Sequence, residues 1–446
     1  MALVAKKIET LEDKYLPLIK EAFDLRALTT FVPNKKRPIH NWFPYTQGFS
    51  ADLIEYLLKK LKIGKKGFVV DPFCGVGTTP LVCVQHGISS IGFDISPIAV
   101  FLADAKINRS YVVKTELLKK EIEGICKSPF KEPSEESLSV TLAKLPLLRH
   151  AYSLDRVKEL LFFREEIKRR RELDQDIYQF LKTGLMAILE EVSNVRKHGA
   201  HYRFINNNNV GVKTLVDPSL FNVRQCLRLK LYKMLSDIQK HPIPGEVDVS
   251  VHQGDARMLS QELSRKVGIR KGRCTAIITS PPYLNRDNYI AQHKIELFFM
   301  EFGDWEAYRR LTATTLRSHV EARSIPEFLC KDLPEVAALV KQVEENGVNY
   351  KGIPEMILGY FQDMECVLRE ISSALKPGGA ATLVVGNVRW AGVVIPVDLL
   401  LIRLGEKHGL VGEEIIITRY KNNSPQQMKR YGKIPVRESI VILRKD

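Results

Sequence analysis

Hydrophobic and polar positions follow a strand–helix–strand rhythm between residues 66 and 104. Apolar runs at residues 68–70 and 89–93 predict two buried strands, and residues 79–86 between them predict a helix. Turns that contain glycine separate these elements. A strand, a helix and a second strand in this order are typical of a βαβ unit in a parallel sheet.

Further apolar runs predict strands in the second half of the chain. Residues 106–245 and 284–355 are instead rich in charge and in helix formers, and apolar side chains in the first of these stretches recur at helical spacing. We therefore expect an α/β protein in which one sheet domain is interrupted by two helical insertions. The later predicted strands are residues 247–251, 275–278, 381–385, 414–418 and 439–443.

The composition is that of an ordinary globular protein, with 45% hydrophobic and 27% charged residues among 446. No apolar run is long enough to span a bilayer, and the charged amphipathic start lacks the apolar core of a signal peptide. We therefore expect a soluble, cytoplasmic protein. The seven cysteines form no C-x-x-C pair, which argues against a zinc knuckle, an iron–sulfur cluster or a disulfide framework, and we expect no metal.

The net charge of +15 narrows the choice of partners. A basic excess of this size favours polyanions, because lysine and arginine contacts to phosphates release counterions. We therefore expect a nucleic acid as partner and no membrane. A basic protein without such a partner is the alternative that charge alone leaves open.

The stretch D-P-F-C-G-V-G-T-T, residues 71–79, joins the first predicted strand to its helix. Glycines there let a ligand approach the backbone closely, and a helix N-terminus offers free N–H donors. A dinucleotide fingerprint, G-x-G-x-x-G, would need a third glycine where this chain has Pro80. By itself the stretch indicates either a ligand-binding loop or a tight turn.

Two acidic residues follow neighbouring strands of the predicted sheet. Asp94 ends the second strand, and Asp255 follows Gly254 at the end of the third. A carboxylate after the second strand is placed to accept hydrogen bonds from a ribose diol. Each residue alone could be a helix N-cap. Together with the glycine loop they predict a nucleoside pocket along one edge of the sheet.

The sequence T-S-P-P-Y, residues 279–283, ends a buried strand abruptly because neither proline can donate a backbone hydrogen bond. Together with residues 71–79, it resembles the S-adenosyl-L-methionine-dependent amino-methyltransferases that modify exocyclic amines of nucleic-acid bases. The resemblance covers roughly residues 38–105, 246–290 and 355–445. It does not cover the long insertion.

This resemblance implies a class I, Rossmann-like methyltransferase sheet with S-adenosyl-L-methionine as cofactor. Residues 40–45 are similar to the segment that covers the methionine end of the cofactor in this family, and residues 375–379 to the turn before its fifth strand. The residues that the resemblance assigns to the cofactor are Tyr45, Asp71, Pro72, Phe73, Gly75, Gly77, Thr78, Thr79, Asp94, Ile95, Asp255 and Ala256.

The same resemblance assigns catalysis to Ser280, Pro281, Pro282 and Tyr283. An exocyclic amine is a poor nucleophile because its lone pair conjugates with the ring. The Ser280 hydroxyl and the Pro281 carbonyl are our candidates for accepting its hydrogens, which favours a pyramidal nitrogen. Tyr283 would stack on a base flipped out of its strand. By the same resemblance, serine rather than aspartate before the prolines points to N4 of cytosine over N6 of adenine.

Basic and aromatic residues interleave in stretches that suit backbone contacts and base stacking. Residues 194–204 run into four asparagines at 206–209, residues 419–433 contain no acidic residue, and residues 286–289 follow the catalytic motif. An ordinary surface loop is the alternative for each. The candidates for substrate binding are Arg286, Asn288, Tyr289, Arg196, Lys197, Tyr202, Arg203, Lys429 and Arg430.

We expect residues 1–105 to hold an N-terminal helix, the cofactor-covering segment and the first half of the methyltransferase domain. Residues 106–245 would form an insertion for substrate recognition, and residues 246–446 the second half, with a smaller insertion at about 284–355. The leading hypothesis is methyl transfer to N4 of cytosine in DNA. Mono- or dimethylation of structured RNA such as rRNA is the alternative, because the insertion lies before the Asp255 element. An N6-adenine enzyme and a nucleic-acid-binding protein with a relic cofactor site are further alternatives.

Overall fold

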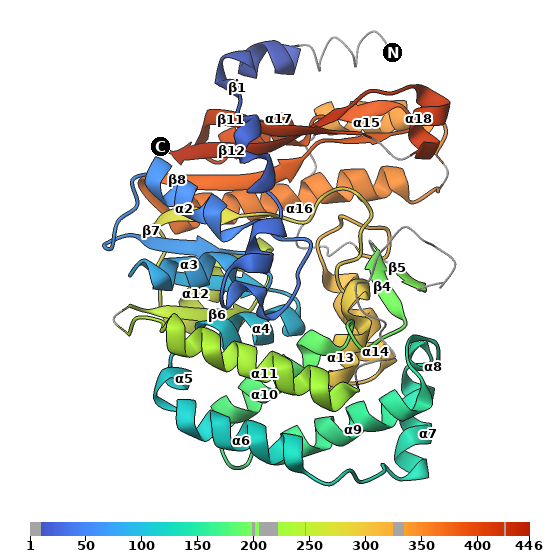
Figure 1. The fold of residues 1–446 in the computed structure, drawn as a ribbon. Helices are drawn as coiled ribbons and strands as arrows, with labels where there is room; N and C mark the ends of the chain where they lie inside the picture. Colours follow the sequence, from blue (N-terminus) through green and yellow to red (C-terminus); the bar gives the residue numbers. More distant parts are fainter. Residues whose placement is uncertain are drawn as a thin grey trace.

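An eight-stranded, mostly parallel sheet forms the centre of the described part of the chain in this computed structural model (Figure 1). The structure describes residues 10–198, 201–204, 222–245, 247–323, 334–348, 350–422 and 425–446. The strand order is β1–β11–β12–β8–β7–β2–β3–β6, and β12 runs antiparallel to both neighbours. The strands are β1 (Ile19–Glu21), β2 (Phe68–Asp71), β3 (Ser89–Asp94), β6 (Val249–Gln253), β7 (Cys274–Thr279), β8 (Leu375–Gly386), β11 (Leu410–Lys421) and β12 (Val436–Lys445).

This sheet confirms the predicted α/β, Rossmann-like class, and each strand predicted from an apolar run is present. Two local features differ from the sequence prediction. The edge strand β1 pairs in parallel with β11. Its three residues are exposed or only partly buried, so it has no apolar run that would predict a strand. Residues 375–379, predicted as a turn, belong to β8. They form a bulge in β8. Leu375 pairs with Cys274 and Ala380 pairs with Ala276, so the residues of β8 between these two pairs lie opposite a single residue of β7.

Helices cover both faces of the sheet, and neighbouring residues of a central strand point to opposite faces. Ile277 packs in the core that contains α16 and α17, whereas Ile278 packs in the core that contains α2 and α3. Both faces of these strands are therefore buried, which explains their continuous apolar runs. The helices of the sheet domain are α2 (Ala51–Lys60), α3 (Thr78–Gln85), α4 (Pro97–Ile107), α12 (Leu259–Val267), α15 (Pro334–Glu345), α16 (Ile353–Ala374), α17 (Val397–Glu406) and α18 (Pro425–Tyr431).

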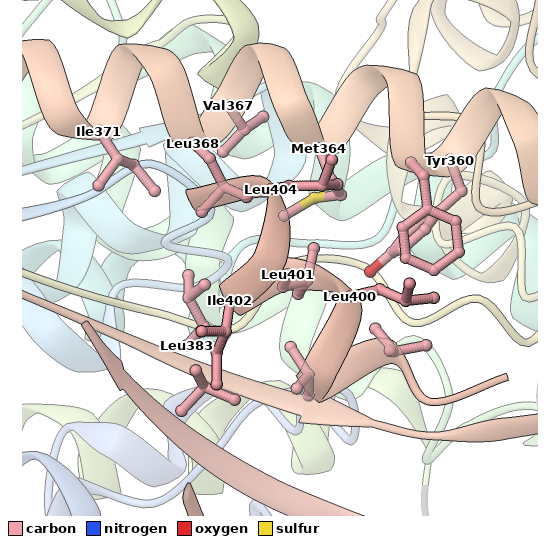
Figure 2. Packing of buried hydrophobic residues seen from close by; sticks show 14 of the residues in the cluster. Tyr360, Met364, Val367, Leu368, Ile371, Leu383, Leu400, Leu401, Ile402 and Leu404 are labelled. Carbon is pink, nitrogen blue, oxygen red and sulfur yellow. The ribbon is translucent and has the colours of Figure 1, made fainter. Parts of the chain in front are cut away.

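The larger core lies between α16, α17 and the sheet. Figure 2 shows one side of α16 facing α17, with β8 beyond them. The short strands β9 (Val388–Trp390) and β10 (Val393–Ile395) form a separate antiparallel pair between β8 and α17. The labelled residues of this core are Tyr360, Met364, Val367, Leu368, Ile371, Leu383, Leu400, Leu401, Ile402 and Leu404.

The described residues between 106 and 245 lie outside the central sheet and share a second core, in which the edge-to-face contact of Trp42 and Phe180 joins them to the N-terminal segment. In Figure 1 these helices lie below the β6 edge of the sheet. None of the described helices is both long and apolar enough to cross a membrane. The elements are α5 (Ser110–Val113), α6 (Thr115–Lys127), α7 (Glu135–Lys144), α8 (Leu147–Ala151), α9 (Leu154–Arg169), α10 (Gln175–Ile188), β4 (Val195–His198), β5 (His201–Phe204) and α11 (Val223–Lys240), with α13 (Lys294–Phe299) and α14 (Trp305–Thr314) after β7.

Candidate active site

The carboxyl ends of β2, β3, β6 and β7 meet at one edge of the sheet and carry the predicted motifs. These strands are parallel, so the segments that follow them lie side by side. The glycine loop follows β2, Asp94 ends β3, Asp255 follows β6 and Ser280 follows β7. All four segments line one cavity of about 330 Å³.

Asp71 holds the loop from behind the cavity. Its Oδ1 accepts hydrogen bonds from the Thr279 hydroxyl at 2.6 Å and the Phe73 amide at 3.1 Å, and its Oδ2 accepts one from the Thr79 hydroxyl at 2.7 Å. Burial raises the pKa of Asp71 to about 7. Asp71 and Thr79 were predicted to bind the cofactor. Both side chains are buried outside the cavity lining and are hydrogen-bonded to each other, and their contacts with the cofactor stay predictions.

The two loop glycines are required for different reasons. Gly75 lines the cavity with a φ of 51°, and a Cβ there would lie 3.0 Å from Cε1 of Tyr45. Gly77, with a φ of 80°, packs against α4, where a Cβ would lie 2.8 Å from the Cβ of Ala103. Gly77 is absent from the cavity lining, and its predicted cofactor contact stays a prediction. The ring of Tyr45 stacks on His293 at 5.4 Å and covers Gly75.

Asp94 lines the cavity and supports the glycine loop. Its Oδ2 accepts the Gly75 amide at 2.9 Å, and its Oδ1 accepts the Ser96 amide at 2.8 Å. A carboxylate offers about four acceptor sites, so each oxygen retains capacity for a further donor. Burial raises the pKa of Asp94 to about 6. The carboxylate is therefore ionised at neutral pH and suited to a diol.

Asp255 has two roles that the sequence presented as alternatives. It caps the short helix Ala256–Met258 by accepting the Arg257 amide at 2.9 Å, and it also lines the cavity. The Arg257 guanidinium binds the same carboxylate at 2.6 Å. Much of the hydrogen-bonding capacity of Asp255 is thus used within the protein.

The predicted catalytic motif enters the same cavity from β7. Ser280, Pro281, Pro282 and Tyr283 all line it. The Tyr283 hydroxyl donates to Oε1 of Glu438 at 2.9 Å, and burial raises the pKa of this hydroxyl well above its usual value. The Tyr283 amide donates to the Tyr289 hydroxyl at 3.3 Å. These contacts fix the ring against the cavity wall.

Comparison with known proteins identifies the family. Residues 12–104 match the family model described as DNA methylase. The type II methyltransferase M.BsoBI of Geobacillus stearothermophilus is 30% identical, over 99% of this chain and 93% of that protein. The type II methyltransferase M.AvaI of Anabaena variabilis is 27% identical, over 94% of this chain and 89% of that protein. The chain belongs to the type II methyltransferases.

Family membership confirms the S-adenosyl-L-methionine-dependent nucleic-acid amino-methyltransferase expected from the two motifs. Among solved structures, the rRNA methyltransferase aviRa from Streptomyces viridochromogenes is 12% identical with a TM-score of 0.30, covering 95% of this chain and 94% of that one. TrmN from Thermus thermophilus is 10% identical with a TM-score of 0.27, covering 89% and 49%. These scores are too low to support an argument.

The cofactor of the methyltransferase is S-adenosyl-L-methionine, and the cavity residues fit it. The missing side chain of Gly75 leaves room in front of Tyr45, and Asp94 offers unused acceptor capacity beside the loop. The direct contacts of individual residues with the cofactor remain predictions. The predicted cofactor residues that line the cavity are Tyr45, Pro72, Phe73, Gly75, Thr78, Asp94, Ile95, Asp255 and Ala256.

Among the predicted substrate residues, Lys197 and Tyr289 line the cavity. Lys197 comes from β4, and its ammonium binds the buried Glu296 and lies 3.1 Å from Nδ1 of His293. Arg203 lies exposed on β5, outside the cavity lining. The asparagines at 206–209 lie outside the described residues.

Three other candidates for substrate binding make hydrogen bonds within the protein, and their contact with a substrate stays a prediction. Arg196 donates to the carbonyl oxygens of residues 190, 193 and 195. The Tyr202 hydroxyl donates to the carbonyl of residue 292 at 2.9 Å. Asn288 is 4% exposed and accepts the amide of residue 291.

The remaining candidates are exposed and lie outside the cavity lining. Arg286 stacks on Tyr350 at 5.3 Å. Lys429 and Arg430 lie on α18, where Arg430 covers the ring of Tyr431 at 5.1 Å. They remain predictions for contacts to a polymer that extends beyond the cavity.

The cavity has further lining residues, of which sequence reasoning missed Glu438, whereas Arg419 and Lys421 belong to the basic stretch at residues 419–433. Arg419, Lys421 and Glu438 line it from β11 and β12. His319 lines it as well, with no hydrogen-bond partner on Nδ1 among the described residues and a pKa that burial lowers to about 4. An acidic residue in the apolar run of β12 was the available signal for Glu438.

Proposed function

We propose that this methyltransferase methylates the exocyclic N4 amine of cytosine in DNA, by direct transfer to a base flipped out of its strand. The observation that carries the proposal is the shared cavity. The loop at Gly75 and Asp94 enters it from β2 and β3, and Ser280 to Tyr283 enter it from β7. S-adenosyl-L-methionine supplies the methyl group.

The catalytic residues hold the amine and the base. The Ser280 hydroxyl and the Pro281 carbonyl accept the amine hydrogens, which favours a pyramidal nitrogen with an available lone pair. Two consecutive prolines keep this segment rigid. Tyr283 stacks on the base, a contact worth about 1–3 kcal/mol. Serine at position 280, rather than aspartate, supports cytosine over adenine.

DNA is the favoured polymer over structured RNA. The matching family model describes a DNA methylase, and the relatives that cover almost the whole chain are type II methyltransferases. The net charge of +15 suits either polymer. The position of the motif inside a cavity supports base flipping, because an amine within a stacked duplex would not reach it.

Methylation assays with separate DNA and RNA pools test the proposal. The enzyme is incubated with each pool and with cofactor labelled in the methyl group, and the nucleosides are analysed by mass spectrometry. We expect labelled N4-methylcytosine in DNA. Labelled N6-methyladenine would reject the choice of base, and label in RNA alone would reject the choice of polymer. The absence of label in both pools, with cofactor binding intact, would indicate a relic site.

A further inference from the structure

A buried carboxylate at the wall of the cavity accepts hydrogen bonds from Tyr283, Lys421 and Arg419, and a longer one of 3.5 Å from the Thr29 hydroxyl. Glu438 on β12 is 1% exposed. Its Oε1 accepts the Tyr283 hydroxyl and the Lys421 ammonium, and its Oε2 accepts the Arg419 guanidinium. We call Glu438, Arg419, Lys421 and Tyr283 the Glu438 cluster. All four residues line the cavity.

The order of the strands places the cluster opposite the cofactor loops. The loops follow β2, β3 and β6, which lie on one side of β7. Arg419 and Lys421 end β11, and Glu438 lies in β12, both on the other side of β7. The Glu438 cluster is therefore the wall of the cavity that a base stacked on Tyr283 would meet.

The cluster holds two cations against one carboxylate. Burial alone would raise the pKa of Glu438, but the hydrogen bond from Arg419 and the charge of Lys421 keep it below its usual value, so Glu438 is ionised. Burial lowers the pKa of Lys421, and Glu438 only partly opposes this effect. The cavity wall thus carries two cationic side chains against one carboxylate.

Lys421 also has unused donors. An ammonium carries three N–H groups, and among the described residues Lys421 donates only to Glu438. Its Nζ lies 5.0 Å from the centroid of the Tyr283 ring. A planar base beside that ring would bring its oxygen atoms, or the phosphates next to it, within reach of these donors.

We propose that Lys421 donates to an acceptor oxygen of the target nucleotide, and that Glu438 is the residue that positions it. The inference rests on the proposed function of the cavity. Two oxygens have the required chemistry: the O2 carbonyl of cytosine and a non-bridging oxygen of a neighbouring phosphate. Adenine has no carbonyl oxygen, so a contact to O2 would add discrimination between the two bases.

The test compares Lys421→Met and Glu438→Gln with the wild-type enzyme on three DNA substrates. The first is unmodified, the second carries 2-thiocytosine at the target, and the third carries a neutral methylphosphonate next to it. Lys66→Met is the matched control, because Lys66 is exposed in the loop before β2, at the opposite edge of the sheet. Calorimetry with S-adenosyl-L-methionine reports whether each variant retains its fold.

We expect Lys421→Met to lower kcat/KM on unmodified DNA about tenfold to a hundredfold, the range for a hydrogen bond to a charged group. Cofactor affinity and the Lys66→Met control should stay at the wild-type level. For the wild-type enzyme, kcat/KM on one of the two modified substrates should be lower than on unmodified DNA by a similar factor. For Lys421→Met, kcat/KM on that substrate should equal its value on unmodified DNA. The substrate that does so, 2-thiocytosine or methylphosphonate, identifies the oxygen. Glu438→Gln should lose the same discrimination, which a purely structural role would leave intact.

The inference would be overturned if the effects of the Lys421→Met substitution and of the modified substrates on kcat/KM were independent. If both modified substrates impaired Lys421→Met as strongly as the wild-type enzyme, Lys421 would contact neither oxygen. Wild-type kcat/KM for Lys421→Met would overturn it as well. Failure of the proposed function looks different, because the wild-type enzyme would then yield no N4-methylcytosine from unmodified DNA. If N6-methyladenine formed instead, a contact to O2 would be rejected and the methylphosphonate substrate would decide the role of Lys421.

Discussion

The hydroxyl of Thr279 donates a 2.6 Å hydrogen bond to Oδ1 of Asp71, and this contact joins the two sequence motifs of the site. Asp71 ends β2 before the glycine loop, and Thr279 ends β7 before Ser280. Thr79, from the first turn of α3, donates to the other oxygen of the same carboxylate at 2.7 Å. One buried side chain thus fixes the cofactor loop relative to the catalytic segment.

Replacement of Asp71 by asparagine should change how stability depends on pH. Burial raises the pKa of Asp71 from 3.8 to about 7. Between these values the folded protein holds a proton that the unfolded chain releases, so the free energy of unfolding falls as pH rises through this window. Asparagine does not titrate. The wild-type stability relative to Asp71→Asn should therefore fall by about 2 kcal/mol from pH 5 to pH 7.

Urea denaturation of both proteins at each pH measures this difference. Asp94 also titrates in this range and is present in both proteins. A stability difference that stays constant with pH would mean that Asp71 is ionised in the folded protein throughout the window.

Removal of the Tyr283 ring should impair turnover more than cofactor binding. Tyr283→Ala removes the stacking surface, and a loss of about 1–3 kcal/mol corresponds to a decrease of roughly fivefold to 150-fold in kcat/KM. Tyr283→Phe keeps the ring and loses only the hydrogen bond to Glu438, so its decrease should be smaller. Steady-state kinetics and calorimetry with the cofactor measure the two effects. Equal losses of activity and cofactor affinity in Tyr283→Ala would instead assign the ring a structural role.

The sequence predicted the sheet because its central strands are buried on both faces. Continuous apolar runs such as residues 275–278 result from that burial, and they marked each central strand correctly. The edge strand β1 is exposed or only partly buried and has no such apolar run. Because these strands could be predicted as parallel neighbours, their carboxyl ends were expected at one edge of the sheet. Both motifs follow such strand ends, so they were expected in one pocket.

Side-chain roles that depend on pairing between distant segments could not be predicted. Glu438 meets Lys421 because β12 pairs antiparallel with β11, and the sequence does not specify that register. Arg196 and Asn288 have the composition of substrate contacts. Their partners are backbone carbonyls and a buried turn that only the folded chain brings near. Residue type indicated which groups could bind a nucleic acid, but not which were already engaged.

Loss of the Asp94 carboxylate should weaken cofactor binding first. Asp94→Ala removes both the acceptor that faces the cavity and the hydrogen bond that holds the Gly75 amide. We expect cofactor affinity to fall at least tenfold, since hydrogen bonds to a charged group are worth about 1.5–3 kcal/mol. Asp52→Ala is a matched control, because Asp52 pairs with Arg37 on the surface of α2. Wild-type affinity in Asp94→Ala would show that the ribose lies elsewhere.

The wild-type enzyme should also lose cofactor affinity in acid. Burial raises the pKa of Asp94 to about 6, so the carboxylate becomes protonated below that pH and loses acceptor capacity. We expect the dissociation constant for S-adenosyl-L-methionine to rise as pH falls through 6. Calorimetry between pH 5 and pH 8 measures it, with Asp94→Asn as the variant that should show a flatter profile.

Arg317 should be one of the most sensitive positions outside the cavity lining. Asp363, fully buried on α16, accepts the Arg317 guanidinium at 2.7 Å and the Arg317 amide at 2.9 Å. A Cβ at Gly359 would lie 2.8 Å from Cδ of Arg317, so the absent side chain makes room for this pair. Arg317→Met leaves a buried carboxylate without its main partner and should destabilise the protein by about 3–5 kcal/mol.

Loss of the Arg317–Asp363 pair should also disturb the cavity, because residues 315, 316, 318 and 319 of the same turn line it. Denaturant unfolding of Arg317→Met, Asp363→Asn and the double variant separates the pair from the two single effects. If the ion pair causes the loss, the double variant should be more stable than the sum of the two single losses predicts. Arg310→Met is the control, since Arg310 pairs with Glu306 on an exposed helix and should change stability little. Strictly additive losses would mean that Asp363 supports the turn without help from the Arg317 charge.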